Sequence, residues 1–179
     1  MRLETEQLNP DNAGLAWGFH VSPDSCDNPD YYNNYIRFCA FSDYQSGVGV
    51  THLLIDKESG NNVLAGYVTL RATSLVSSGA DGVKNVQPAL EIAELAVHED
   101  YERNGVGLGV IAIAVDMADS LRRKSIGIKY ILVCSDPKSI GFYEKSGFVK
   151  LSSLYEALHD GWNNHCEPLF ITLPEIADY

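Results

Sequence analysis

A glycine-rich segment, RNGVGLG at residues 103–109, joins a strand-like segment to a long helical one. Residues 89–97 (ALEIAELAV) alternate as the two faces of a strand do, and the helical pattern after the glycines continues to about Arg123. Residues 129–134 (KYILVC) are nearly all apolar, which is typical of a short strand buried in a parallel pair. A strand, a loop, a helix and a second strand in this order predict an α/β protein with a mixed sheet.

The glycine loop has the composition of an anion-binding site. Glycines let the backbone approach a ligand closely, and the N-terminus of the following helix adds partial positive charge. Arg103 would add a charge-assisted contact. Two better-known phosphate motifs fit poorly, because Val110 replaces the third glycine of a dinucleotide-binding loop and the Gly-Lys pair of a Walker loop is absent. A tight turn without a ligand is the alternative interpretation at this point.

The net charge of −11 is distributed unevenly along the chain. Residues 102–150 hold eight basic and five acidic side chains, a local +3, so the rest of the chain carries −14. A positive segment in an otherwise acidic protein supports a site for an anionic group. The acidic remainder argues against general nucleic-acid binding, which requires a basic surface.

Capping residues and apolar spacing predict the elements of the first half. A helix is expected over residues 29–41, with Asn28 as its N-cap. One face of that helix would carry Tyr32, Tyr35, Ile36 and Cys39. Residues 51–56 and 63–73 are expected to form a hairpin, and residues 74–87 a polar surface excursion.

The second half is expected to continue with one more well-bounded helix. That helix covers residues 137–145, with Asp136 as its N-cap and Gly147 as its stop. Residues 154–160 are also expected to be helical. Further strands are expected over 148–151 and 167–173.

Length and composition favour one soluble domain that spans residues 1–179. The sequence contains no apolar run of the ~18 residues that a membrane span needs, and its start does not resemble a signal peptide. A cytoplasmic location is therefore expected. The four cysteines show no ligand spacing, so reduced thiols are expected rather than disulfides or a zinc site. They are Cys26, Cys39, Cys134 and Cys166.

Two longer segments resemble the GCN5-related N-acetyltransferase (GNAT) family. They are LAVHEDYERNGVGLGVIAIAVDMA and KYILVCSDPKSIGFYEKSGF, which contain in order the family's strand, its Q/R-x-x-G-x-G/A loop, a helix, the next strand and the FYEK-GF helix. The match covers residues 89–151, the expected acetyl-CoA-binding core. The resemblance implies a single-domain GNAT-like fold, with a mixed, mostly antiparallel sheet, helices on both faces and a central β-loop-α-β cofactor unit. The upstream segments more loosely resemble the branch of toxin-type aminoacyl-tRNA acetyltransferases.

The resemblance implies acetyl-CoA as the acetyl donor, with no metal. Backbone groups at the end of the strand would pair with the pantetheine arm, and amides of the loop would hold the pyrophosphate. The donor contacts expected on this basis are Leu95, Ala96, Val97, Arg103, Asn104, Gly105, Val106, Gly107, Leu108, Asp136, Ser139 and Phe142. One residue departs from the family pattern: Glu102 stands where Gln or Arg is usual, and we expect its side chain to face solvent.

Acetyl transfer to an amine needs a proton for the departing thiolate and a group that takes the proton of the amine. Tyr143 aligns with the family tyrosine that serves as general acid. Glu91 falls where the histone-acetylating branch carries a catalytic glutamate, and Glu94 lies on the opposite face of the same strand. The base is therefore expected to be Glu91, Glu94 or neither, since a solvated strand carboxylate is an equally good interpretation of each.

Other aromatic and histidine side chains show no catalytic spacing. Tyr31, Tyr32 and Tyr35 would wall the acceptor site if the first helix lies as it does in this family, although ordinary packing is the more common explanation. Trp17 and Trp162 are interpreted as packing residues. The five histidines are expected in loops or at the surface, and they are His20, His52, His98, His159 and His165.

Three functions follow, and the leading one is an acetyl-CoA-dependent N-acetyltransferase acting on a primary amine of a small molecule or peptide. The alternatives are toxin-like acetylation of aminoacyl-tRNA and a CoA-binding module without catalysis. The expected partners are acetyl-CoA and an amine acceptor, with no membrane and no nucleic acid other than tRNA as the alternative acceptor. The sequence leaves open whether the chain forms a homodimer.

Overall fold

The structure is a computed structural model, and it describes residues 1–58, 60–78, 82–151, 155–157 and 166–176. The chain divides into two compact units. The first unit contains Met1–Arg71 and Ala93–Ala114, and the second contains Ala72–Ile92 and Val115–Tyr179. The expectation of one domain over residues 1–179 stays a prediction.

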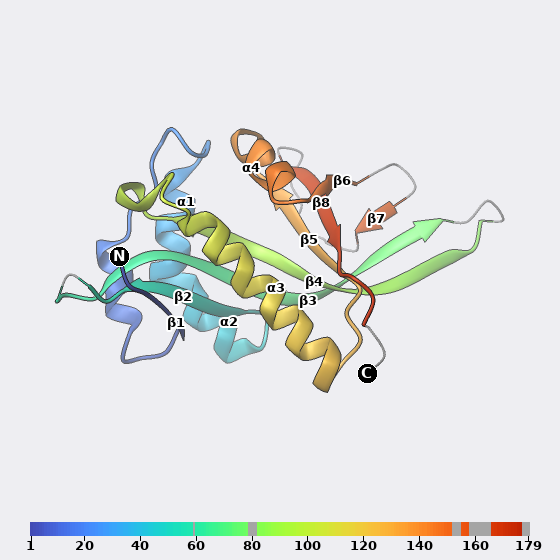
Figure 1. Ribbon diagram of the computed structural model, residues 1–179, viewed down its shortest axis with the longest axis horizontal. Helices are drawn as coiled ribbons and strands as arrows, with labels where there is room; N and C mark the ends of the chain where they lie inside the picture. The colour runs from blue at the N-terminus through green and yellow to red at the C-terminus, as the bar shows by residue number, and fades with distance from the viewer. Residues whose placement is uncertain (59, 79–81, 152–154, 158–165, 177–179) are drawn as a thin grey trace. The chain divides into compact units, whose positions relative to one another are not determined.

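Strands and helices alternate irregularly along the chain (Figure 1). Four of the helical segments are short or irregular and are labelled η. In chain order the elements are β1 (Leu3–Gln7), η1 (Ala13–Gly18), α1 (Pro29–Asn34), η2 (Tyr35–Cys39), α2 (Ala40–Ser46), β2 (Val50–Asp56), β3 (Val63–Ser78), β4 (Lys84–Val97), η3 (Glu99–Tyr101), α3 (Val106–Lys124), β5 (Tyr130–Ser135), η4 (Pro137–Ser139), α4 (Ile140–Lys145), β6 (Val149–Lys150), β7 (Tyr155–Ala157) and β8 (Glu167–Thr172).

The sheet of the first unit contains β1, β2, the first part of β3 and the end of β4. β2 lies between β1 and the first part of β3, with Leu3 opposite Asp56 and Val50 opposite Leu70. The expected hairpin of β2 and β3 is confirmed. β1 was not expected from the sequence, because LETEQ is only five residues long and Leu3 is its one apolar residue.

A helical stretch runs without a break from α1 through η2 to α2, five residues beyond the expected end at residue 41. Asn28 caps it as predicted, since its side-chain oxygen accepts a hydrogen bond from the backbone N–H of Tyr31. η2 is π-helical, and a π turn inserts extra backbone that rotates the residues after it. For that reason Ala40 is buried and Cys39 is exposed, although Cys39 was expected on the inner face.

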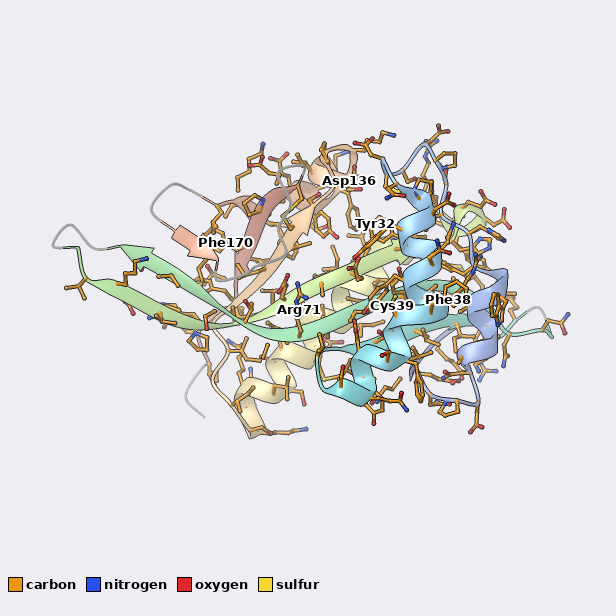
Figure 2. All side chains as sticks on the ribbon, turned by 180° about the vertical axis from the view of Figure 1, so that it is seen from behind. Tyr32, Phe38, Cys39, Arg71, Asp136 and Phe170 are labelled. Carbon is orange, nitrogen blue, oxygen red and sulfur yellow. A yellow bond between two sulfur atoms is a disulfide. The ribbon has the colours of Figure 1, made fainter. Side chains whose placement is uncertain are left out.

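Helices cover both faces of β3 within the first unit. Tyr67 is buried on one face, where its ring stacks on Tyr35 of η2 with 6.3 Å between the ring centroids. On the other face Gly66 lies so close to α3 that an added Cβ would stand 3.0 Å from Val110. Figures 1 and 2, drawn from opposite sides, show the helical stretch 29–46 on one face of the strands and the first turns of α3 on the other.

The second unit contains one parallel strand pair and several antiparallel ones among the described residues. β4 runs parallel to β5 over Ala89–Ile92, as the near-continuous apolar run of β5 predicted, and β8 pairs antiparallel with both β5 and β6. Over the described residues the hydrogen-bonded strand order is β1-β2-β3-β4-β5-β8-β6, with β7 paired to β3 off this path.

Two expectations for the second unit are wrong. Residues 74–87 are not a polar excursion, because β3 extends to Ser78 and β4 already begins at Lys84. Of the segment 154–160, expected to be helical, residues 155–157 form strand β7, and the others lie outside the described residues. In the second case pairing with β3 overrides the local pattern, because β7 lies antiparallel to Leu75–Ser77.

A disulfide joins Cys134 of β5 to Cys166, which precedes β8. The expectation of reduced thiols is therefore wrong for these two residues. The antiparallel register of β5 and β8 places Cys134 opposite Pro168, and this brings the two Cα atoms to 5.4 Å. A separation of 32 residues in the sequence gives no sign of that register. Within the described part of the chain, none of the helices has the length and apolarity of a membrane span.

Candidate active site

The end of β4 carries the backbone groups expected to meet the pantetheine arm. The ladder between β4 and β5 ends at Ile92, but β4 continues through Leu95, Ala96 and Val97 into the first unit. In the part of the chain that the structure describes, these three residues make no ladder bond to β5. Beyond them the backbone N–H of His98 donates to the carbonyl of Ala65 at 2.9 Å, which holds this end of β4 to β3.

The glycine loop turns sharply between η3 and α3. Arg103 and Gly105 both have left-handed backbone conformations, with φ of 62° and 81°. That conformation is free of steric cost for glycine but not for Arg103, and such strain is often found at functional sites. Residues 103–105 are exposed, and α3 begins at Val106. The first N–H groups of a helix have no partner within it, so the start of α3 offers donors to an anion.

The side chain of Glu102 was expected to face solvent, and this expectation is wrong. The side chain is half-buried, and its Oε1 accepts a hydrogen bond from the hydroxyl of Ser25 at 2.5 Å. The carboxylate is therefore held by the segment before α1. This bond gives Glu102 a structural partner that the sequence pattern did not reveal.

Four tyrosines and one carboxylate form a cluster in the first unit. Tyr31 donates a hydrogen bond to Glu94 of β4 at 2.6 Å, and its ring packs edge-on against Tyr32 with centroids 5.3 Å apart. Tyr31 also stacks on Tyr35, which stacks in turn on Tyr67. The hydroxyl of Tyr67 donates to the carbonyl of Tyr32 at 2.9 Å. The tyrosines expected to wall the acceptor site thus lie together around Glu94.

The side chains of the cluster differ in their exposure to solvent. Tyr31 is 48% exposed, whereas Tyr35 and Tyr67 are buried. On the helical stretch Figure 2 shows Tyr32 and Phe38 on different sides, and Phe38 is exposed. Burial, together with the hydrogen bond to Glu94, raises the pKa of Tyr31 well above its usual range. Burial also raises the pKa of Tyr35, which hydrogen-bonds to Asp43.

Glu91, the other candidate base, lies in the second unit at the parallel pair with β5. It stands opposite Leu132 in the register and is only 2% exposed. Glu94 is the more accessible of the two carboxylates, since it is half-buried. A base must reach the proton that it removes, and this favours Glu94 over Glu91.

The predicted helix with the candidate acid is confirmed in the second unit. Asp136 accepts a hydrogen bond from the backbone N–H of Lys138, and its carbonyl accepts one from that of Ser139. Tyr143 on α4 is 5% exposed and packs edge-on between Phe142 and Phe148, at centroid distances of 5.1 and 5.4 Å. Asp136, Ser139 and Phe142 are half-buried around the start of this helix. The other predicted donor contacts, Leu95–Val97 and Arg103–Leu108, lie in the first unit with Glu94.

One sequence-based interpretation of a single residue is wrong, because His52 is buried in strand β2 and not in a loop or at the surface. His98 lies in the loop between β4 and η3, as expected, although it is buried there. Trp17 is 64% exposed and packs edge-on against Phe38, with 5.6 Å between the ring centroids. His159, His165 and Trp162 lie outside the described residues. The described residues contain no cluster of His, Cys, Asp and Glu side chains suited to a metal ion.

Comparison with known proteins places this geometry in a family. The sequence profile described as "Acetyltransferase (GNAT) family" matches residues 14–148. No curated protein sequence matches the chain significantly.

Solved structures with the same fold include several bacterial toxins. A tyrosine-to-phenylalanine mutant of the AtaT toxin has a TM-score of 0.76 at 17% identity, covering 95% of this chain and 89% of that chain. AtaT complexed with acetyl-methionyl-tRNAfMet has a TM-score of 0.73 at 17% identity, covering 96% and 95%. AtaTR bound with acetyl-CoA has a TM-score of 0.68 at 19% identity, covering 95% and 92%. The fold expected from the sequence is confirmed.

Proposed function

Because the chain belongs to the GNAT family of acetyltransferases, we propose that it transfers the acetyl group of acetyl-CoA to a primary amine that arrives as a cation. The amine would belong to a small molecule or to a peptide. The observation that carries this proposal is the tyrosine cluster around Glu94, in which a carboxylate lies among aromatic rings at an exposed edge. Aromatic faces and a carboxylate together attract an ammonium group.

Acetyl-CoA would be held mainly by backbone groups. The edge of Leu95–Val97 would pair with the amides of pantetheine, and the N–H groups from Arg103 to Leu108 would receive the pyrophosphate. Asp136, Ser139 and Phe142 would add contacts from the start of the η4–α4 segment. One solved structure of the same fold is bound with acetyl-CoA, which supports a donor of this kind.

The reaction joins the amine nitrogen to the acetyl carbon and breaks the bond between that carbon and the sulfur of CoA. The ammonium must first lose a proton, and Glu94 would accept it directly or through water. A backbone N–H at Leu95–Val97 would stabilise the carbonyl oxygen as it becomes negative. Tyr143 would then donate its hydroxyl proton to the departing thiolate, because a tyrosine with the usual pKa of about 10 is protonated at neutral pH.

The hydrogen bond from Tyr31 to Glu94 resembles the one that an acceptor ammonium would make. The hydroxyl donates to the carboxylate oxygen at 2.6 Å, and an acceptor ammonium would donate to the same group. Tyr31 lies in the first turn of α1, at the exposed edge of the cluster. Because an ionised carboxylate accepts several hydrogen bonds, the Tyr31 hydroxyl and an acceptor ammonium could both donate to Glu94.

Aminoacyl-tRNA is the second candidate acceptor, and a specific observation favours it. One of the solved structures with this fold is AtaT complexed with acetyl-methionyl-tRNAfMet, and the likeness extends over 96% of this chain. The amino group of an aminoacyl ester has a low pKa, so this reaction needs no dedicated base. Against it stands the first unit, which carries five basic and thirteen acidic residues, a net −8.

The test is an acceptor screen that measures free thiol released from acetyl-CoA. The acceptors are cationic and neutral amines, peptides with free amino groups and charged tRNA, each at physiological salt. Turnover with amines or peptides, reduced by Glu94→Gln, is the expected result. Efficient acetylation of aminoacyl-tRNA with no turnover of free amines or peptides would replace the proposal with the second candidate.

A further inference from the structure

The segment that leads into the glycine loop is bound to the N-terminal part of the first unit at several points. We call residues 98–102 the stem. The backbone N–H of Glu99 donates to the carbonyl of His20 at 2.9 Å. The hydroxyl of Tyr101 donates to Asp56, and Ser25 donates to Glu102. Because the stem ends where the loop begins, its position sets the direction of the loop amides.

His98 makes two side-chain hydrogen bonds from the first position of the stem. Its Nδ1 accepts from the backbone N–H of Asp100 at 3.1 Å, which caps the short helix η3. Its Nε2 lies 3.0 Å from the carbonyl oxygen of Gly18. A nitrogen that accepts from an N–H carries no proton, and a carbonyl only accepts, so the ring is neutral with its proton on Nε2. Both ring nitrogens therefore take part in a hydrogen bond, and Nδ1 also lies 3.9 Å from a carboxylate oxygen of Asp100.

The imidazole is also fixed by packing. It is 6% exposed, and it lies edge-on to Phe19 at 5.7 Å and to Tyr101 at 5.8 Å between ring centroids. Gly18 and Phe19 are in turn held from the helical stretch, since Arg37 donates to the carbonyl of Phe19. The ring thus joins a turn of the stem to a segment that is itself anchored.

We propose that His98 is a positioning residue for the pyrophosphate of acetyl-CoA. By holding the N–H of Asp100 and the carbonyl of Gly18 together, it fixes the stem in the one arrangement that aims the amides of residues 103–108 at a single anion. The inference rests on the proposed function, in which those amides bind the pyrophosphate. Amides bind an anion well only when they converge, so a stem that is free to turn lowers affinity without removing any ligand contact.

Two substitutions of His98 each remove one of its two side-chain hydrogen bonds and keep the other. His98→Asn keeps an acceptor at the position of Nδ1 and loses the donor to Gly18. His98→Gln reaches the position of Nε2 and keeps that donor, but it loses the cap on Asp100. Each variant is measured by calorimetry for the dissociation constant of acetyl-CoA, and by kinetics for kcat/KM with acetyl-CoA and with S-acetylpantetheine. The second donor carries the same thioester but no pyrophosphate.

Both variants are expected to weaken acetyl-CoA binding by about 3- to 10-fold, the size of one lost hydrogen bond. Both should leave kcat/KM for S-acetylpantetheine within about 2-fold of the unsubstituted protein, because that donor does not use the loop. Either folded variant alone decides the matter. Unchanged acetyl-CoA affinity, or an equal loss for both donors, would overturn the proposal, since a residue that only supports the core affects both donors alike.

His52 provides a matched control, because it is a second buried histidine of the same unit, on β2 opposite Gln7 and Val68. His52→Asn and His52→Gln are expected to lower the melting temperature without a difference between the two donors. A donor-specific loss at His52 would count against a special role of His98. The calorimetric comparison needs no acceptor, so it still tests His98 if the screen of acceptors finds no substrate and the proposed function fails.

Discussion

The candidate acid packs by its ring against two other aromatic side chains. Tyr143 is buried between Phe142 and Phe148, and these contacts are made by its ring. Replacement by phenylalanine keeps the ring and removes only the proton donor. The variant therefore keeps both ring contacts, and a thermal melt shows whether the fold is kept when the hydroxyl is removed.

Tyr143→Phe is expected to lower kcat by about 10²-fold, because the thiolate would leave without a proton. The dissociation constant of acetyl-CoA should change little. Thiol release and calorimetry measure the two quantities, and a thermal melt checks the fold. Full activity of the folded variant would remove Tyr143 from the mechanism.

Glu94→Gln tests the other half of the proton transfer. Glutamine keeps an oxygen for the Tyr31 hydroxyl and loses the negative charge and the basicity. We expect kcat/KM for cationic amines to fall by about 10²-fold, with acetyl-CoA affinity unchanged. Glu91→Gln is the companion variant on the same strand. If Glu91→Gln abolishes activity and Glu94→Gln does not, the base is Glu91 and the assignment made here is wrong.

Local motifs predict some single residues correctly and others not. Tyr143, Asn28 and Asp136 lie where their local motifs predicted, because a cap or a short helix depends on its neighbours along the chain. Cys134 was misjudged, and the burial and the partner of His98 were not predicted, because Cys166 and Gly18 are far away from them in the sequence. Contacts of that kind depend on strand register and loop path, which no local pattern encodes.

At the scale of elements, the order of β4, the loop, α3 and β5 was predicted, although β4 begins at Lys84 and not at residue 89. The strands, the glycines and the long helix each carry a strong local preference, and all of them agree. The helical stretch 29–46 was predicted only in part. Its π turn moves the inner face by one residue, from Cys39 to Ala40, and a search for regular helical spacing does not detect such an insertion.

The glycine loop makes a prediction of its own. Gly107→Leu should block the approach of the backbone to the pyrophosphate and weaken acetyl-CoA binding by about 10-fold or more, since a side chain would stand where the anion must lie. Calorimetry measures the effect. Gly14→Leu is the control, because a Cβ at Gly14 meets nothing within 4 Å. Unchanged affinity in a folded Gly107→Leu protein would show that the loop is only a turn.

The contact between η2 and β3 predicts a loss of stability in alkali. Burial raises the pKa of Tyr67, and of Tyr31 and Tyr35, above the value of about 10 that the unfolded chain has. Above that pH the unfolded state binds fewer protons than the folded state, so the free energy of unfolding falls as pH rises. Below about pH 9 these groups should contribute no pH dependence.

Urea unfolding between about pH 8 and pH 11 measures this slope. Tyr67→Phe should flatten it, although the variant also loses the hydrogen bond to the Tyr32 carbonyl at every pH. Tyr44→Phe, at an exposed tyrosine, is the matched control and should leave the slope unchanged. An equally steep slope in Tyr67→Phe and in the unsubstituted protein would contradict the role given to burial.

At the scale of the whole molecule, charge bears on the choice of acceptor. The first unit contains the Glu94 cluster and carries a net −8, and the second unit carries eight basic and eleven acidic residues, a net −3. An acidic surface concentrates cations near it and steers them, and it repels polyanions. We therefore expect a series of otherwise similar peptides to rank by charge. At low salt, kcat/KM should be highest for a basic peptide, lower for a neutral one and lowest for an acidic one. At about 0.5 M salt, where the screening length falls to a few ångströms, the three values should converge.

Aminoacyl-tRNA is included as a fourth acceptor. If it is acetylated faster than every peptide at physiological salt, the few basic residues of this chain are gathered where net charge does not reveal them, and the preference for a cationic amine is wrong.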